Sequence, residues 1–266
     1  MKFIHKLFDL VLKVGSSPIA FIRYVAYCVK RYRTNDLLRF ANKVPTDKGI
    51  DLHNYIRVYD YFLEGRRLEK LVLCEIGLFR DEYQTSSKQE RNQRGKSEES
   101  YALAPSLKMW RDYLPNATII GFDISTFRQP KDKKCFIVQG DQSARDDLKK
   151  IFDIEEELDI VIDDALHASP HQQISFSYLF PRLKTGGLFF IEDLRYQPEG
   201  FERSDVPTTL ELLKELKTTG VWSSPLATPE EKEVVESHVK EVHFFESLKY
   251  RNPVAGKDAF ALIIKK

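Results

Sequence analysis

From about residue 70 onward, short apolar runs alternate with longer stretches whose apolar residues recur at helical spacing. The runs are rich in Val, Ile and Phe, which is typical of strands buried on both faces of a sheet. Strands that alternate with helices form right-handed crossovers and build a parallel sheet. We therefore expect strands at residues 71–76, 118–124, 135–139, 159–162 and 188–191, and helices at residues 106–113, 144–152, 170–183, 208–217 and 229–238.

The last two apolar segments, residues 241–248 and 259–264, predict an antiparallel pair. Their connection contains Asn252, Pro253 and Gly256, which favour a turn. The expected fold class is α/β, a Rossmann-like doubly wound seven-stranded sheet that is mostly parallel and ends in a C-terminal antiparallel hairpin. Residues 44–266 would form this domain, and residues 1–43 would be an N-terminal basic helical extension.

The first forty residues differ in charge from the rest of the chain. They carry eight Lys and Arg residues against two Asp residues, whereas the net charge of the whole chain is +1. Their longest apolar stretch, residues 18–29, is too short to span a bilayer as a helix. Either these residues lie on a membrane surface as a basic amphipathic anchor, or they pack on the main domain or on a second subunit of a homo-oligomer. The balanced net charge gives no reason to expect a nucleic-acid partner.

Three cysteines, Cys28, Cys74 and Cys135, lie within apolar runs and have no metal-ligand spacing. They predict buried free thiols in a reducing compartment. The N-terminal apolar stretch is interrupted by charges and lacks the pattern of a signal peptide. We therefore expect a cytoplasmic protein, with peripheral contact at the inner membrane surface if the basic residues bind lipid.

Residues 81–100 are almost wholly polar and show no core-forming periodicity. They follow the first predicted strand, so they would lie over the carboxyl edge of the sheet, where ligands bind to such folds. Long segments of this kind are either functional lids or unstructured insertions. With residues 196–207, this segment is expected to supply the walls of a substrate pocket.

Two pairs of carboxylates follow two of the predicted strands. Asp163 and Asp164 end one apolar run, and Glu192 and Asp193 end another. Side by side at the carboxyl edge of the sheet, these groups carry more negative charge than a site can hold unless a hard cation neutralises it. His167, three residues after Asp164, becomes a candidate base. Helix caps and ion pairs are the structural alternatives for each residue taken singly, and His171 is expected to be exposed.

The first three strands end in residues suited to a nucleoside ligand. Gly77 follows the first strand and lets the backbone approach a ligand closely. Asp123 ends the second strand, where a carboxylate accepts hydrogen bonds from ribose hydroxyls, and Asp141 and Gln142 follow the third, where they could meet an adenine edge. Each residue alone is a common cap or turn former, but the ordered set is more specific.

This order resembles that of class I S-adenosylmethionine-dependent methyltransferases. Over about residues 44–195 the chain is similar, more narrowly, to the metal-dependent sugar O-methyltransferases of macrolide tailoring (mycinamicin type) and to their relatives in surface-polysaccharide biosynthesis. The motifs that carry the resemblance are Thr46-Asp47-Lys48-Gly49, His53-Asn54-Tyr55, Glu75-Ile76-Gly77, Ser106-Leu107-Lys108-Met109-Trp110, Gly140-Asp141-Gln142-Ser143, Asp163-Asp164 with His167, and Ile191-Glu192-Asp193-Leu194.

The resemblance implies an enzyme that moves a methyl group from S-adenosylmethionine to a sugar hydroxyl of a glycan or glycosylated metabolite. It implies that His167 is the base, that Asp164, Glu192 and Asp193 hold Mg²⁺ or another divalent cation, and that the residues on the cofactor side are Glu75, Gly77, Asp123, Asp141, Gln142 and Asp163. Two departures from the family pattern stand out. Phe79 occupies the place of a second glycine, and Ala165 and Leu166 replace a more polar turn.

Two other functions remain open on the sequence. A Rossmann-type oxidoreductase acting on a nucleotide-sugar would need glycines around a pyrophosphate, and residues 77–80 lack them. A non-catalytic protein that binds a membrane or a glycan-assembly partner would use the basic first forty residues, but it would have no need of the carboxylates and the histidine.

Overall fold

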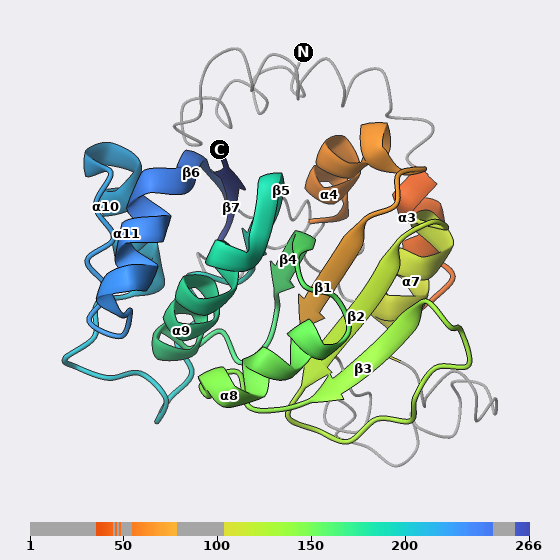
Figure 1. Ribbon diagram of the computed structural model, residues 1–266, viewed down its shortest axis with the longest axis horizontal. Helices are drawn as coiled ribbons and strands as arrows, with labels where there is room; N and C mark the ends of the chain where they lie inside the picture. Colours follow the sequence, from red (N-terminus) through yellow and green to blue (C-terminus); the bar gives the residue numbers. More distant parts are fainter. Residues whose placement is uncertain (1–35, 45, 47, 49–54, 79–103, 247–258) are drawn as a thin grey trace, which may run out of the picture.

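The computed structural model describes residues 36–44, 46, 48, 55–78, 104–246 and 259–266. Within these residues, seven strands form one sheet in the order β3-β2-β1-β4-β5-β7-β6 (Figure 1). The neighbours from β3 to β5 pair in parallel, and β7 runs antiparallel to both β5 and β6. The predicted fold class is therefore confirmed. The strands are β1 Val72–Ile76, β2 Thr118–Asp123, β3 Cys135–Gln139, β4 Leu158–Asp163, β5 Leu183–Ile191, β6 Val239–Glu246 and β7 Ala259–Lys265.

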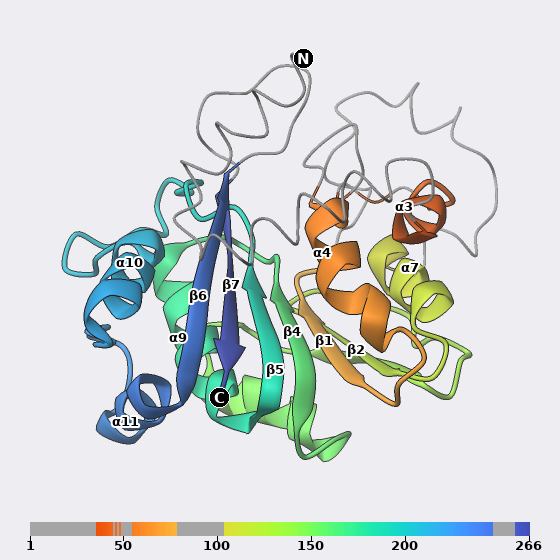
Figure 2. The same cartoon turned by 90° about the horizontal axis from the view of Figure 1, so that it is seen from above.

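Helices cover both faces of the sheet (Figure 2). One face packs against α3 (Asp36–Ala41), α4 (Ile56–Leu63) and α7 (Pro105–Tyr113). The other face packs against α8 (Arg145–Leu148), α9 (Ser169–Leu179), α10 (Thr209–Thr219) and α11 (Pro229–His238). Among the described residues, short 3₁₀ segments lie at η1 Glu64–Arg66, η3 Lys149–Asp153 and η4 Phe180–Arg182.

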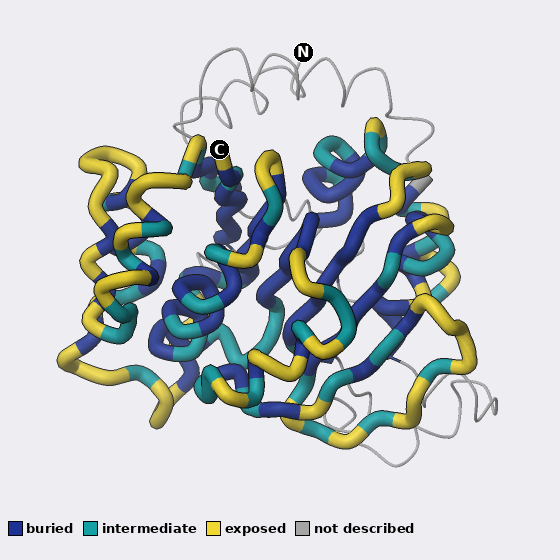
Figure 3. The backbone as a smooth tube through the Cα atoms, in the orientation of Figure 1, coloured by how far each residue is buried: buried dark blue, intermediate teal, exposed yellow. Residues whose placement is uncertain are grey.

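The strands are largely apolar because alternate residues enter two different cores. Leu73 faces the core under α4 and α7, whereas its neighbour Cys74 faces the core under α9. Burial is concentrated in the strands and in the inward sides of the helices (Figure 3). Cys74 and Cys135 are buried free thiols, as predicted. Cys28 lies outside the described residues.

The structure differs from the predicted elements where glycine, proline or polar residues interrupt the apolar pattern. β5 begins at Leu183, five residues before the predicted start, because Leu183 pairs with Leu158 ahead of a β-bulge, and the polar and glycine residues at 184–187 lie in this irregular part of the strand. α9 ends at Leu179, and Pro181, which has no backbone N–H to donate, lies in the 3₁₀ segment that follows. The helix predicted at residues 144–152 is one turn of α8 followed by η3.

Parts of the predicted domain organisation lie outside the described residues, namely residues 1–35 of the basic extension and residues 81–100 of the polar segment. α3 falls within the predicted extension, and its Leu37 and Ala41 are buried in the core formed with α4 and α7. Among the described residues, no helix combines the length and the apolar character that crossing a bilayer requires.

Gly77 allows the loop after β1 to lie against the loop after β4. Its φ is +88°, in the left-handed region that favours glycine. A Cβ atom at this position would lie 2.2 Å from the carbonyl oxygen of Asp164 and 2.4 Å from the Cα of Ala165. Both obstacles are backbone, so they cannot rotate away. The contact fixes the spacing of these two loops, the second of which carries Asp164 and His167.

Gly77→Ala should therefore destabilise the fold by about 2 kcal/mol or more, because strain at positive φ adds to the backbone clash. Urea denaturation followed by circular dichroism measures the change in the free energy of unfolding. The matched control is Gly65→Ala, since Gly65 is exposed and a Cβ there meets nothing within 4 Å. Equal stability of the two variants would contradict this account of Gly77.

Candidate functional site

A cavity of about 550 Å³ opens at the carboxyl ends of β1 to β4. The lining residues follow strands that lie next to one another in the sheet, so the cavity occupies the edge at which such folds bind ligands. Four of the six predicted cofactor residues, Gly77, Asp123, Asp141 and Gln142, are on its wall. The other lining residues are Ile76, Leu78, Phe122, Ile124, Gly140, Asp164, Ala165, Leu166, His167, His171 and Phe201.

Two of the three aspartates on the cavity wall, Asp123 and Asp141, are held by backbone amides. The Asp123 carboxylate accepts hydrogen bonds from the N–H groups of Leu78 and Ser125, each at 2.7 Å. The Asp141 carboxylate accepts bonds from the N–H of Ser143 at 2.8 Å and from its hydroxyl at 2.7 Å. Both carboxylates are half-buried. They are therefore fixed in direction while keeping part of their surface on the cavity.

Asp163 is fully buried and does not line the cavity. Its Oδ2 accepts hydrogen bonds from the Gln142 amide at 2.6 Å and from the Ser175 hydroxyl at 2.5 Å. Burial raises the pKa of Asp163 to about 6, and these hydrogen bonds oppose the rise. Asp163 thus connects α9 to the loop after β3 and contacts the cavity wall through Gln142.

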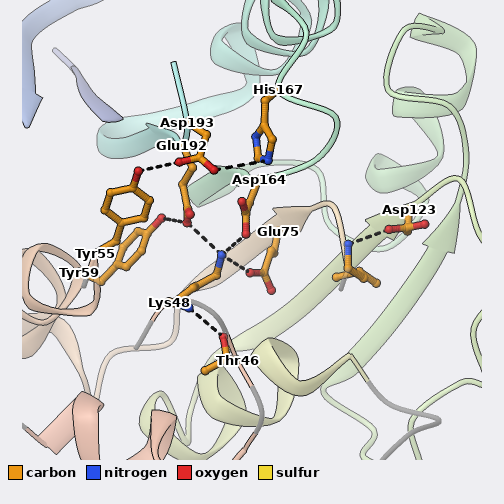
Figure 4. Close-up of polar contacts among 11 residues, drawn as sticks. Thr46, Lys48, Tyr55, Tyr59, Glu75, Asp123, Asp164, His167, Glu192 and Asp193 are labelled. Atoms are coloured by element: carbon orange, nitrogen blue, oxygen red, sulfur yellow. Dashed lines mark hydrogen bonds and ion pairs between the residues drawn. The ribbon is translucent and has the colours of Figure 1, made fainter. Parts of the chain in front are cut away.

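The predicted metal carboxylates Asp164 and Glu192 converge on one positive charge, the ammonium of Lys48 (Figure 4). Lys48 Nζ donates to Asp164 Oδ2 and, at 2.9 Å, to Glu192 Oε1. It also lies 3.3 Å from Glu75 Oε1. Lys48 is only 1% exposed. The cluster therefore joins the end of β1, the loop after β4 and the end of β5 through a single buried lysine.

The cluster carries more negative than positive charge. Burial alone would lower the pKa of Lys48, but the surrounding carboxylates outweigh it and raise this pKa well above its usual value. Lys48 is thus an ammonium. Burial also raises the pKa of Glu75, a rise that Lys48 opposes. Ser106 lies close enough to oppose this rise as well, but neither oxygen of Glu75 accepts a hydrogen bond of good geometry within the described part of the chain. Glu75 does not reach the cavity wall.

Asp193 points away from Lys48. Its Oδ1 accepts a hydrogen bond from the Tyr55 hydroxyl at 2.7 Å, and its Oδ2 lies 3.7 Å from Nε2 of His167. Two of the three predicted metal carboxylates are thus brought together, and the third is turned toward the predicted base. As the side chains stand, no group of three or more His, Cys, Asp or Glu residues in the described ranges is arranged to hold a metal ion.

Two tyrosines at the start of α4 also bond to these carboxylates: Tyr55 to Asp193, as described above, and Tyr59 to Glu192. The Tyr59 hydroxyl, buried within α4, donates to Glu192 Oε1. Burial and the neighbouring Glu192 raise the pKa of Tyr59, so the phenol keeps the proton that it donates. The carbonyl of Lys48 accepts a hydrogen bond from the N–H of Ile56 at 3.2 Å, which ties the lysine to the same helix.

His167 and Asp193 share an uncommon backbone geometry. Their φ values are +64° and +51°, and among the described residues no other non-glycine residue has a positive φ. Such strained positions gather at functional sites because the surrounding structure has to enforce them. His167 lies at the cavity wall with its ring 5.8 Å from that of Tyr196, in an edge-to-face arrangement. With these backbone conformations, the His167 imidazole and the Asp193 carboxylate lie next to each other, 3.7 Å apart.

The sequence reasoning missed several residues of the site. Lys48 and Tyr55 lie in motifs that carried the resemblance, but no role followed from them, and Tyr59 gave no signal. His171, expected to be exposed, is half-buried and lines the cavity, because α9 turns it toward the loop that carries Phe201. Phe201, within residues 196–207, also lines this cavity, and the prediction that this segment forms the wall of a substrate pocket stays a prediction.

Comparison with known proteins yields no matching family model. Among curated proteins, the chain is 31% identical over 169 residues to an 8-demethyl-8-alpha-L-rhamnosyl tetracenomycin-C 2'-O-methyltransferase of Streptomyces olivaceus, covering 62% of this chain and 40% of that protein. It is 31% identical over 191 residues to the mycinamicin VI 2''-O-methyltransferase of Micromonospora griseorubida, covering 69% and 44%. The chain thus spans less than half the length of these relatives.

Among solved structures, the chain is similar to the MycE methyltransferase of the mycinamycin biosynthetic pathway, solved in complex with Mg and SAH. The TM-score is 0.63 at 26% identity, covering 86% of this chain and 54% of that one. A second structure of MycE also contains mycinamycin VI. These comparisons confirm the resemblance to sugar O-methyltransferases and the Rossmann-like methyltransferase fold.

Asp163→Asn should remove part of the pH dependence of stability. A carboxyl group whose pKa is raised on folding adds stability below its unfolded pKa, near 3.8, and loses that contribution as the pH rises through about 6. Relative to the variant, the wild type should lose roughly 3 kcal/mol of unfolding free energy between pH 4 and 7. Urea titrations at each pH give the difference curve. An exposed control, Asp153→Asn, should leave it flat, and a flat curve for Asp163→Asn would refute the assignment.

Proposed function

We propose that this chain is a methyltransferase domain that moves a methyl group from S-adenosylmethionine to a hydroxyl of a sugar-containing acceptor, with a divalent cation, Mg²⁺ in the first instance, at the Asp164–Glu192 carboxylates. The observation that carries the proposal is the placing of His167 and Asp164 at one end of a cavity whose other wall bears Asp123, Asp141 and Gln142. A base and a cation site then face the reactive end of a nucleoside ligand.

The cavity suits S-adenosylmethionine in size and in polarity. A volume of about 550 Å³ lies within the usual range for ligands of this size. Backbone amides orient the Asp123 carboxylate, which can accept hydrogen bonds from ribose hydroxyls. Ile124 and Phe122 offer apolar surface to the adenine ring. Gly77 has no side chain, so the loops after β1 and β4 can meet at the cavity wall. The names of the sugar O-methyltransferase relatives, and SAH in the MycE complex, support the same cofactor.

The donor chemistry of the buried cluster fits a hard divalent cation. Asp164 and Glu192 direct carboxylate oxygens to one point, and the Glu75 carboxylate lies beside them. Lys48 contacts all three carboxylates and brings one positive charge to them. Asp164 and Glu192 would hold the ion, with Asp193 at the edge of the group. A bound cation would lower the pKa of a coordinated hydroxyl and orient it. Mg in the MycE complex supports this assignment.

His167 is suited to take the proton of the acceptor hydroxyl. Sugar hydroxyls lose their proton far above neutral pH, whereas an imidazole accepts one near neutrality. The protonated ring would be stabilised by Asp193, whose carboxylate lies 3.7 Å from Nε2 and is held in place by Tyr55. S-adenosylmethionine, when bound, supplies an electrophilic methyl group, so that the O–C bond forms as the C–S bond breaks.

The acceptor is expected to approach the same end of the cavity. Tyr196 is 39% exposed and stands edge-to-face with His167, which places an aromatic surface beside the base. Aromatic side chains pack against the apolar faces of many ligands while their polar edge stays hydrated. Glycosylated acceptors of the relatives, such as the rhamnosyl tetracenomycin, support a sugar hydroxyl as the nucleophile.

The direct test is to incubate the full chain with methyl-labelled S-adenosylmethionine, Mg²⁺ and a panel of glycosylated acceptors, and to follow the label by mass spectrometry. We expect methylated product with Mg²⁺ and loss of product in excess EDTA, because the acceptor hydroxyl then keeps its ordinary pKa. Full activity in EDTA would remove the cation from the proposal. Calorimetric binding of NAD in place of S-adenosylmethionine would overturn the proposed cofactor.

His167→Ala should lower methyl transfer by roughly 10²- to 10⁴-fold, the usual contribution of a general base. The affinity for S-adenosylmethionine, measured by calorimetry, should stay within a few-fold of wild type, because the nucleoside residues are untouched. The matched control is His238→Ala, since His238 is exposed at the end of α11. Wild-type turnover by His167→Ala would exclude the histidine as the base.

A further inference from the structure

The buried lysine raises a question that the proposed function leaves open. Lys48 Nζ bonds to Asp164 and Glu192, the two carboxylates that converge on one point and that we assign to the cation. An ammonium and a divalent ion cannot both take the same oxygen lone pairs, because like charges at such a distance repel strongly in a dry environment. Lys48 must therefore either exclude the divalent ion or give way to it.

Charge balance favours a lysine that gives way. Asp164, Glu192 and Glu75 bring three negative charges around Lys48, all within a region that is largely removed from water. Lys48 brings one positive charge to these three carboxylates, and a divalent ion in its place would bring two. Buried ionic groups are tolerated when their charges are matched. Because its charge is twice that of the ammonium, the ion is attracted more strongly by the same carboxylates.

Glu75 gives the displaced lysine a destination. It is fully buried, lies 3.3 Å from Lys48 Nζ, and neither of its oxygens accepts a hydrogen bond of good geometry within the described residues. A buried carboxylate without a donor is unfavourable unless another state of the protein supplies one. A small shift of the ammonium away from Asp164 and Glu192 would turn the present contact with Glu75 into a full hydrogen bond.

We propose that Lys48 is a built-in counter-ion that holds Asp164 and Glu192 together until a divalent cation displaces its ammonium onto Glu75. This inference rests on the proposed function in one respect, the assignment of the cation to these two carboxylates. It adds that Lys48 and the cation compete for the same oxygens and that Glu75, although not a ligand of the ion, assists its binding. Lys48 and Glu75 are thus positioning residues with opposite effects on metal affinity.

The test measures Mn²⁺ binding to the full chain by electron paramagnetic resonance, without S-adenosylmethionine or acceptor. Lys48→Met, which keeps the length of the side chain and removes its charge, should bind Mn²⁺ tighter than wild type by roughly tenfold or more. Glu75→Gln should bind it more weakly, because the displaced ammonium loses its charged partner. The control Lys70→Met removes an exposed charge just before β1 and should bind as wild type does.

A second readout is the thermal midpoint of unfolding. In EDTA, Lys48→Met should melt below wild type because two buried carboxylates lose their counter-ion. Added Mg²⁺ should raise the midpoint of the variant more than that of the wild type, since ligand binding stabilises the folded state in proportion to affinity. Should Lys48→Met fail to fold, the Mn²⁺ affinity of Glu75→Gln alone tests the inference.

Unchanged or weaker Mn²⁺ binding by Lys48→Met would overturn the inference, as would Mn²⁺ binding that Glu75→Gln leaves unaltered. Absence of Mn²⁺ binding by both wild type and Lys48→Met would overturn it as well. None of these results depends on methyl transfer. A chain that exchanges the ions as described but methylates no acceptor would refute the proposed activity and leave the ion exchange intact.

Discussion

The site depends on the neutralisation of carboxylates that the sheet brings together at one edge. β1, β4 and β5 each end in acidic residues, and parallel pairing delivers Glu75, Asp164 and Glu192 to the same small volume. Without a positive charge between them, these groups would repel one another or take up protons. Lys48 supplies that charge, and Tyr59 adds a hydrogen bond to Glu192. The position of α4 on the sheet thus becomes part of the electrostatics of the site.

The carboxylates at this edge of the sheet differ in how far they are buried. On the wall of the cavity, Asp123 and Asp141 are fixed by backbone amides and remain partly accessible, which suits a ligand with hydroxyl groups. Behind the wall, Asp163 and Glu75 are fully buried and have raised pKa values. Burial therefore divides carboxylates that look alike in the sequence into those that can touch a ligand and those that support the ones that do.

Prediction from the sequence succeeded where a local pattern has one structural outcome. The bounds of β3 and of α11 were predicted to the residue, because turn formers and caps flank a clear apolar or amphipathic run. The start of β5 was missed because the polar and glycine residues between Leu183 and Leu188 give no apolar signal. In the site, the residues at strand ends were found, but Tyr59 was not, since nothing in the pattern of α4 shows which helical face meets β5.

The sequence by itself determined that acidic residues and a histidine follow strands of a parallel sheet, since the alternation of apolar runs and helices encodes the direction of the strands but not their order. It therefore determined which edge of the sheet carries the site. Only the tertiary structure decided that Asp164 and Glu192 meet at the ammonium of Lys48 while Asp193 turns to Tyr55 and His167. The physical reason is distance along the chain. Lys48 is 116 residues before Asp164 and 144 before Glu192, and contacts over such separations arise from packing, which no local periodicity records.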